Sequence, residues 1–432
     1  MRFIFIKKRK FWKRFIFYTI ILPILLVITA LLIIQVKQND IIKGEIAKLN
    51  EQHNGLITIG ETNLSLFGNF PYISIKVDDV KVFENKEDNA PLIMDVKDIY
   101  MGFNLWNIVE GNNNIRSLLV EEGVFNIVLH KDGSNNLVNA LAATHETEEV
   151  DSTHFNLKNI KLKNLDIHKL DEENNRDIET FIYWGKGGFK KDKDLISGHI
   201  DSEFELNVID DGDTTYIKHK HFEFHTDIAL NEKTGLLNIK PSGITMEHGD
   251  FEIEGSIDTK KDMTLDLSIK GTKPNFDMFI AFAPEDLIPV LERYNNAGKI
   301  YFNASIQGPT TKGHMPFIDA KFGANEAFLE NTEKQKKIHE MGFQGHFTNG
   351  EERSLKTMVF SITNMNAKLD KGNFSGSLVV TNFEEPDVDM QVNADFNLEF
   401  MTGFLDLKNI QNTSGNVTLK MNFHDIIDLD HP

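Results

Sequence analysis

Apolar and polar residues alternate with a period of two through most of the chain after residue 55. The alternation is clearest in six segments, which we predict to be strands: 73–78, 251–258, 263–270, 300–307, 387–396 and 417–423. Successive side chains of a strand point to opposite faces, so each segment has one dry and one wet face, as is usual in antiparallel sheets. The pattern therefore predicts a mainly β fold.

Helical spacing is rare in this part of the chain. Residues 275–295 carry an apolar stripe that is interrupted at Pro284, and residues 400–407 form a shorter candidate helix. Two short helices cannot cover the dry faces of so many strands, and an apolar sheet face must be covered. The sheet must therefore fold into a sandwich, close into a barrel, or curve into a trough whose apolar lining contacts a ligand.

The first 54 residues have a different pattern. Residues 15–34 read FIFYTIILPILLVITALLII, twenty residues without a charge, which is the length that spans a bilayer core. The apolar region of a cleaved signal peptide is shorter, about 7–15 residues, and no small-residue cleavage pattern follows this one. We predict a transmembrane helix at 15–36. Apolar residues at helical spacing predict that it continues as a juxtamembrane helix over 37–54, ending at Gly55.

Charge determines the expected orientation of this helix. Residues 1–14 contain seven basic side chains and no acidic one. The basic residues are Arg2, Lys7, Lys8, Arg9, Lys10, Lys13 and Arg14. Because basic residues remain on the cytoplasmic side, we expect a cytoplasmic segment at 1–14 and export of everything after the span.

The rest of the chain is acidic. Removing those seven residues from the 46 basic residues leaves 39 against 65 acidic ones, a formal charge of −26. Such a body disfavours nucleic acid as a partner, since phosphate binding needs a basic face. The chain has no cysteine, which excludes disulfides, thiolate metal sites and a cysteine nucleophile. The acidic stretch HETEEVDST at 145–153 predicts a boundary between a β module at 55–145 and a second region at 146–432.

Motifs that carry chemistry are missing from the sequence. No phosphate-binding loop, dinucleotide fingerprint, zinc-protease motif or nucleophile elbow occurs. The best metal candidate is the segment KHKHFEFH at 218–225, whose possible ligands all occupy odd positions: His219, His221, Glu223 and His225. In a strand these side chains fall on the wet face, where polar residues are expected, and the two lysines nearby oppose a cation. We therefore expect no metal site, no cofactor and no enzymatic activity.

The order of features in the first 145 residues resembles the N-terminal region of the AsmA family. After the basic segment, the span and the helix comes GLITIGETNLSLFGNFPYISIKVDDVKVFEN, followed by WNIVEGNNNIRSLLVEEGVFNIVLHKDGSNNLVNAL. The family's motif positions correspond to Phe70–Pro71, Asp79–Val80, Ile115–Leu118, Asp132–Gly133 and Asn136. Family members often have an aromatic residue after that asparagine, whereas this chain has Leu137.

Later segments resemble the same family. Residues 275–328 and 399–423 are similar to modules in which a short helix precedes a glycine and an alternating strand, most clearly at GKIYFNASIQGP. Residues 150–245 match only in general character. Many members are longer, so the region at 146–432 is either a short form or a truncated form of the family's β-groove.

The resemblance implies a transmembrane helix followed by an elongated, curved antiparallel sheet that forms a groove, with a few short helices. It implies anchoring in the bacterial inner membrane, with the bulk of the chain in the periplasm. The implied function is outer-membrane biogenesis, in which phospholipid binds or moves along the apolar groove. The alternative is a non-conducting scaffold that assists outer-membrane protein assembly. Phospholipid and membrane are the implied partners, together with outer-membrane assembly proteins in the scaffold case.

The alternation nominates the side chains that would line such a groove. They are Phe251, Ile253, Ile257, Leu265, Leu267, Ile300, Phe302, Ile306, Val392, Phe396, Leu419 and Met421. All twelve are apolar positions of predicted strands, so a single dry face is expected to hold them.

Overall fold

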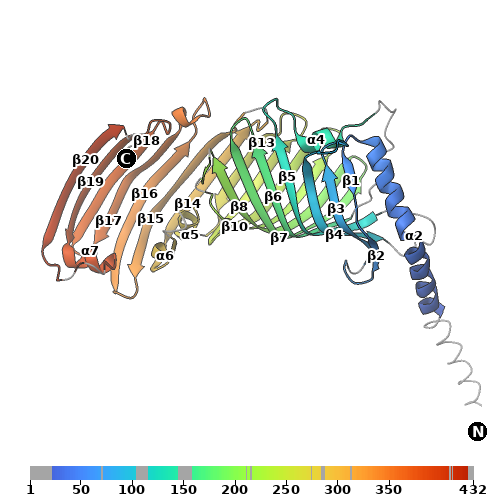
Figure 1. Ribbon diagram of the computed structural model, residues 1–432. Helices are drawn as coiled ribbons and strands as arrows, with labels where there is room; N and C mark the ends of the chain where they lie inside the picture. Colours follow the sequence, from blue (N-terminus) through green and yellow to red (C-terminus); the bar gives the residue numbers. More distant parts are fainter. Residues whose placement is uncertain are drawn as a thin grey trace, which may run out of the picture. The chain divides into compact units, whose positions relative to one another are not determined.

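The computed structural model describes residues 22–69, 72–103, 115–144, 158–210, 212–214, 217–273, 275–283, 288–311, 314–407, 410 and 412–426. These residues are mainly β, which confirms the predicted fold class at that level (Figure 1). The chain divides into two compact units, Met1–Phe189 and Lys190–Pro432. The boundary predicted after residue 145 stays a prediction, because residues 145–157 lie outside the described ranges.

The first unit contains a long helix and a sheet. The helices are α2 (Leu22–Gln52) and α4 (Asn136–Leu141). The strands are β1 (Leu56–Thr58), β2 (Thr62–Ser65), β3 (Ile73–Phe83), β4 (Leu92–Phe103), β5 (Ile115–Leu129), β6 (Asn159–Asp171) and β7 (Arg176–Asp192). Both β1 and β2 pair with β3, and the sheet then continues through β4, β5, β6 and β7.

One pairing departs from the expected antiparallel order. Strands β5 and β6 are parallel, with Ser117 opposite Asn159 and Leu129 opposite Asp171. A parallel pair requires a crossover connection rather than a tight turn. The chain between these strands is long enough for one, and α4 lies within it. The alternation within each strand is the same for both kinds of pair, so it could not distinguish them.

The core of the first unit shows how α2 and the sheet share one apolar face. Ile42 of α2 is 3% exposed and packs in a cluster with Ile75, Val77, Val96 and Leu165 of the sheet. Next to this contact, Asn39 of the helix hydrogen-bonds the Thr62 side chain of β2. The second half of α2, the segment predicted as a juxtamembrane helix, therefore packs on part of the dry face of this sheet.

The predicted membrane span is described only from Leu22 onward. There it forms the first part of α2, which continues without interruption to Gln52, just before the expected stop at Gly55. Within the described residues, no helix meets the length and hydropathy needed to cross a membrane. The residues expected to determine topology all lie outside the described ranges: Arg2, Lys7, Lys8, Arg9, Lys10, Lys13 and Arg14. The predictions for the span and its orientation stay untested.

The second unit is a long, open, curved antiparallel sheet (Figure 1). Its strands are β8 (Leu195–Asp210), β9 (Asp213–Thr214), β10 (Lys220–Asn231), β11 (Leu236–Met246), β12 (Gly249–Asp258), β13 (Thr264–Gly271), β14 (Tyr294–Gly308), β15 (Phe317–Asn331), β16 (Lys336–Thr348), β17 (Val359–Leu369), β18 (Gly372–Thr381), β19 (Asp387–Asn397) and β20 (Asn416–Ile426). Strand β8 pairs with β9 and β10, and from β10 each strand pairs with the next one in sequence. No pairing among the described strands joins β20 back to β8, so this sheet does not close on itself.

Short helices are the only other regular elements described in this unit. They are α5 (Asp277–Ile280), α6 (Ile288–Leu291), a 3-10 turn (Leu355–Thr357) and α7 (Leu398–Phe404). The predicted helix at 275–295 is thus two short helices, and its last residues, from Tyr294, already belong to β14. Helix α7 confirms the second helical prediction, with Asn397 accepting a hydrogen bond from the Phe400 backbone N–H as the N-cap.

Gly255 lies where two adjacent strands of this sheet approach each other closely. Its φ is +143°, and a Cβ built there would lie 2.0 Å from the backbone oxygen of Asp266 on β13. We expect Gly255→Ala to lower the free energy of unfolding by roughly 1–3 kcal/mol, the usual cost of such backbone strain. Gly243→Ala on β11 is the matched control, because its Cβ would meet nothing within 4 Å. Denaturant unfolding of the full chain measures both, and equal losses would contradict this account.

Candidate functional site

Cross-strand register places the predicted lining residues on one face of the second unit. Ile257 lies opposite Leu265, and Leu267 lies opposite Ile306. Farther along the sheet, Val392 lies opposite Met421. Directly opposed residues have side chains on the same face, so these pairs form rows that run from strand to strand. We call the face that holds these rows the apolar face.

The rows of the apolar face continue through strands that the sequence did not single out. One row joins Leu267, Ile306 and Ile318 across β13, β14 and β15. Another row joins Ile362, Leu378, Met390 and Phe423 across β17, β18, β19 and β20. The apolar face therefore extends across the sheet from β10 to β20 without a strand that interrupts it.

Helix α5 covers part of the apolar face. Met278 of this helix is fully buried, in a cluster with Phe251 and Ile300 from β12 and β14. Phe279 of the same helix lies 5.7 Å from Phe322 on β15, measured between ring centroids. Just after the helix, Phe282 stacks on Phe302 with 5.6 Å between their centroids. This end of the face is a packed core.

Helix α7 covers a second part of the same face. Phe400 and Phe404 are each 5% exposed and pack with Ile338, Leu369 and Phe374 of β16, β17 and β18. Met341 of β16 packs against this cluster and also against the α5 cluster. The two helices therefore cover neighbouring parts of one face, rather than opposite sides of the sheet.

The twelve predicted lining residues divide into two groups. Phe251, Ile300, Phe302 and Phe396 pack in or against the clusters below α5 and α7, so they belong to the protein's own core. The other eight belong to none of the three clusters formed by the described residues: Ile253, Ile257, Leu265, Leu267, Ile306, Val392, Leu419 and Met421. All eight lie on the apolar face. Seven of them are half-buried, and Leu419 is 40% exposed.

Sequence reasoning did not find a polar cavity beside α5. It has a volume of about 550 Å³, and residues of β11, β12, β14 and the α5 segment line it. Lys273 pairs there with Asp250, and His248 lies 2.9 Å from a carboxylate oxygen of Glu292. Burial disfavours the charged form of Asp250, but hydrogen bonds from Lys273 and Thr245 outweigh it and hold the pKa of this carboxyl below its usual value. The cavity thus combines both signs of charge next to apolar rings.

The opposite face of β8 and β10 is polar, as expected. The histidines considered as metal ligands each lie beside a carboxylate of β8: His219 Nδ1 is 2.7 Å from Glu205, His221 Nε2 is 3.5 Å from Glu203, and His225 Nδ1 is 2.9 Å from Asp201. The register places these acids on the strand opposite. An ion-pair ladder on the solvent face accounts for this histidine pattern, and Glu223 is exposed beside it.

A comparison of the chain with models of known protein families, and with curated proteins, finds no match. The site must therefore be interpreted from its own geometry.

His199 extends the polar ladder and provides a pH test. Its Nδ1 lies 2.9 Å from Asp227, and this hydrogen bond, against a small opposing effect of burial, raises the pKa of His199 above its ordinary 6.5; Asp201 adds to the rise. Because the folded state favours the charged imidazole, the stability gained is full in acid and is lost as pH rises through the raised pKa.

We expect a proton NMR titration to give His199 a pKa above 6.5 and Asp227→Asn to lower it. Glu232→Gln, which removes the partner of Lys191, is the control and should leave the His199 titration unchanged. A wild-type pKa at or below 6.5 would contradict the assigned pair.

Proposed function

We propose that this protein binds phospholipid along the apolar face of its second unit, with acyl chains against the rows of side chains that α5 and α7 leave uncovered. The observation that carries the proposal is the division of the face. Short helices cover Phe251 and Phe302, whereas the register extends the same face to Leu267 and Ile306, which belong to no core cluster.

Hydrophobic burial supports an acyl chain as the occupant. Rows of half-buried aliphatic side chains on neighbouring strands present a surface with few hydrogen-bonding groups, so a ligand gains from contact mainly by leaving water. Each buried methylene contributes about 0.8 kcal/mol, so an acyl segment of about ten methylenes gains up to roughly 8 kcal/mol. A surface of this kind does not discriminate strongly among acyl chains, which suits a lipid carrier better than an enzyme.

The polar cavity beside α5 supports a phospholipid rather than a free hydrocarbon. Lys273, His248 and the acids around them offer partners to a charged headgroup. Helix α5 borders both this cavity and the apolar face, since Ile280 lines the cavity while Met278 packs with Phe251. A ligand with a polar head and apolar tails would match both surfaces.

The wider biological role also stays part of the proposal. The sequence predicts a cytoplasmic N-terminus, one inner-membrane span and a periplasmic body. With the resemblance to the AsmA family, this suggests a role in moving phospholipid toward the outer membrane. A scaffold that assists outer-membrane protein assembly is the alternative, in which the apolar face would contact protein.

Photocrosslinking in living cells tests the proposal directly. A photoreactive phenylalanine analogue at Leu267 should form covalent adducts with phospholipid, because that side chain lies on the uncovered part of the apolar face. The neighbouring position Ser268 is the matched control: it belongs to the same strand, points to the opposite face and is exposed. Mass spectrometry of the purified full chain identifies the adducts. Adducts to protein alone at position 267 would favour the scaffold instead.

A charge on the apolar face should remove lipid without unfolding the protein. We expect Leu267→Glu to lower the yield of lipid adducts at the opposing position, Ile306, by about tenfold, since an ionised carboxylate disfavours acyl contact. Ser268→Glu should leave that yield unchanged. Unfolding of the Leu267→Glu variant, measured by circular dichroism, would instead place Leu267 in a structural core and contradict the proposal.

A further inference from the structure

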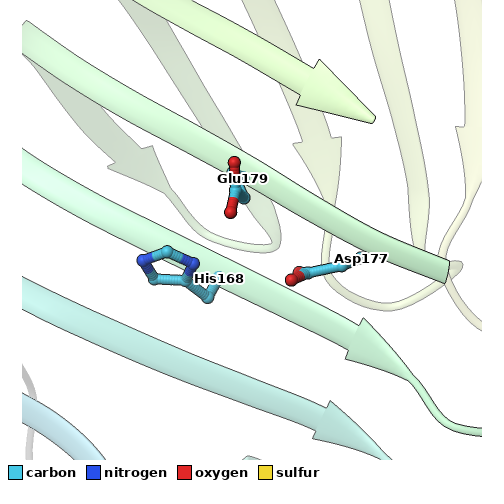
Figure 2. Close-up of side chains that lie close together, drawn as sticks. All are labelled: His168, Asp177 and Glu179. Atoms are coloured by element: carbon cyan, nitrogen blue, oxygen red, sulfur yellow. The ribbon is translucent and has the colours of Figure 1, made fainter. Parts of the chain in front are cut away.

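Three potential metal ligands gather on the first unit. His168 lies on β6, and Asp177 and Glu179 lie on the adjacent strand β7 (Figure 2). One ligand atom from each residue lies within 4.8 Å of the other two. All three side chains are half-buried.

The hairpin between β6 and β7 explains why these residues meet. Asp171 ends β6, and its side chain accepts hydrogen bonds from the backbone N–H groups of Glu173 and Asn174 in the turn. The register that starts at this turn places His168 directly opposite Glu179. Asp177 is two residues before Glu179 on the same strand, so both carboxylates project from the same face as the imidazole.

The three residues lie on the side of the sheet opposite the core. Leu165 of β6 is 1% exposed and packs in the core cluster of the first unit. His168 is three positions farther along β6 with regular pairing to β7 in between, so it projects to the other face. The cluster shares no residue with the proposed lipid surface, so the two proposals can fail independently.

Asp177 is a second observation that points to a cation. Its Oδ1 atom is buried from solvent and has no hydrogen-bond partner. Leaving such an acceptor unsatisfied costs about 1–3 kcal/mol, and more when the group is charged. A bound cation would satisfy this buried oxygen.

We propose that His168, Asp177 and Glu179 bind a divalent transition-metal ion, of which Zn²⁺ is the test case. Zinc binds both imidazole nitrogen and carboxylate oxygen, whereas Ca²⁺ and Mg²⁺ prefer oxygen ligands alone. Tetrahedral zinc at a bond length of about 2.0–2.2 Å separates its ligand atoms by about 3.3 Å. The ligand atoms, which lie within 4.8 Å of one another, would reach this spacing through small rotations about side-chain bonds. The ion would link the two strands of the hairpin and keep at least one position for water.

Calorimetric titration of the full chain in detergent, stripped of metal and then given Zn²⁺ alone, tests this site. We expect the wild type to bind one equivalent of Zn²⁺ tightly. His168→Ala should weaken this binding by roughly 10–100-fold or more, since even outer partners of metal ligands matter that much. The matched control is the double variant His199→Ala, His225→Ala, which removes two imidazoles from the polar ladder and should retain the tight equivalent.

Asp177→Asn keeps the proposal testable if His168→Ala fails to fold. The amide has nearly the shape of the carboxylate but is a poor ligand, so this variant should fold, lose the tight equivalent and lose the rise in thermal midpoint that Zn²⁺ produces in the wild type. Loss of Zn²⁺ binding in the ladder variant, with retention in His168→Ala and Asp177→Asn, would overturn the proposal. So would a wild type that binds no tight equivalent.

Discussion

The apolar face of each sheet must be shielded from water, and the rest of the structure depends on what shields it. In the first unit a long helix contributes, with Ile42 of α2 in one buried cluster with Ile75 and Val77. In the second unit α5 and α7 shield the face only in part. What remains is an ordered row of aliphatic side chains that belongs to no core cluster, and our functional proposal concerns its occupant.

The same constraint separates structural residues from candidate ligand contacts. Phenylalanines are prominent where α5 and α7 cover the second sheet, as at Phe251, Phe302 and Phe400, because large rings fill the space between a short helix and a sheet. Aliphatic residues such as Ile257, Leu265 and Leu267 occupy the uncovered rows of β12 and β13. A smoother aliphatic surface suits a mobile chain, whereas interlocked rings suit a fixed contact.

Sequence alone predicted the strands well, because a period of two is a local property that survives any tertiary arrangement. It identified the side that Leu267 and Ile306 share, and it located α7. It could not show that α5 folds back over Phe251, since docking of a helix depends on the whole sheet. The parallel pairing of β5 and β6 was equally hidden. The cluster at His168 was missed because its members lie on two different strands. Only the register of the hairpin that turns after Asp171 brings them together.

The most direct test of the central claim is an experimental density map of the full chain in phospholipid nanodiscs. Our account predicts elongated density, unconnected to the polypeptide, along two neighbouring rows, that of Ile257 and Leu265 and that of Leu267 and Ile306. It also predicts continuous protein density over Phe251 and Phe302, where α5 and the residue Phe282 after it pack. Polypeptide from this chain or from a second copy, covering Leu267 and Ile306 as closely as α5 covers Phe251, would contradict the account.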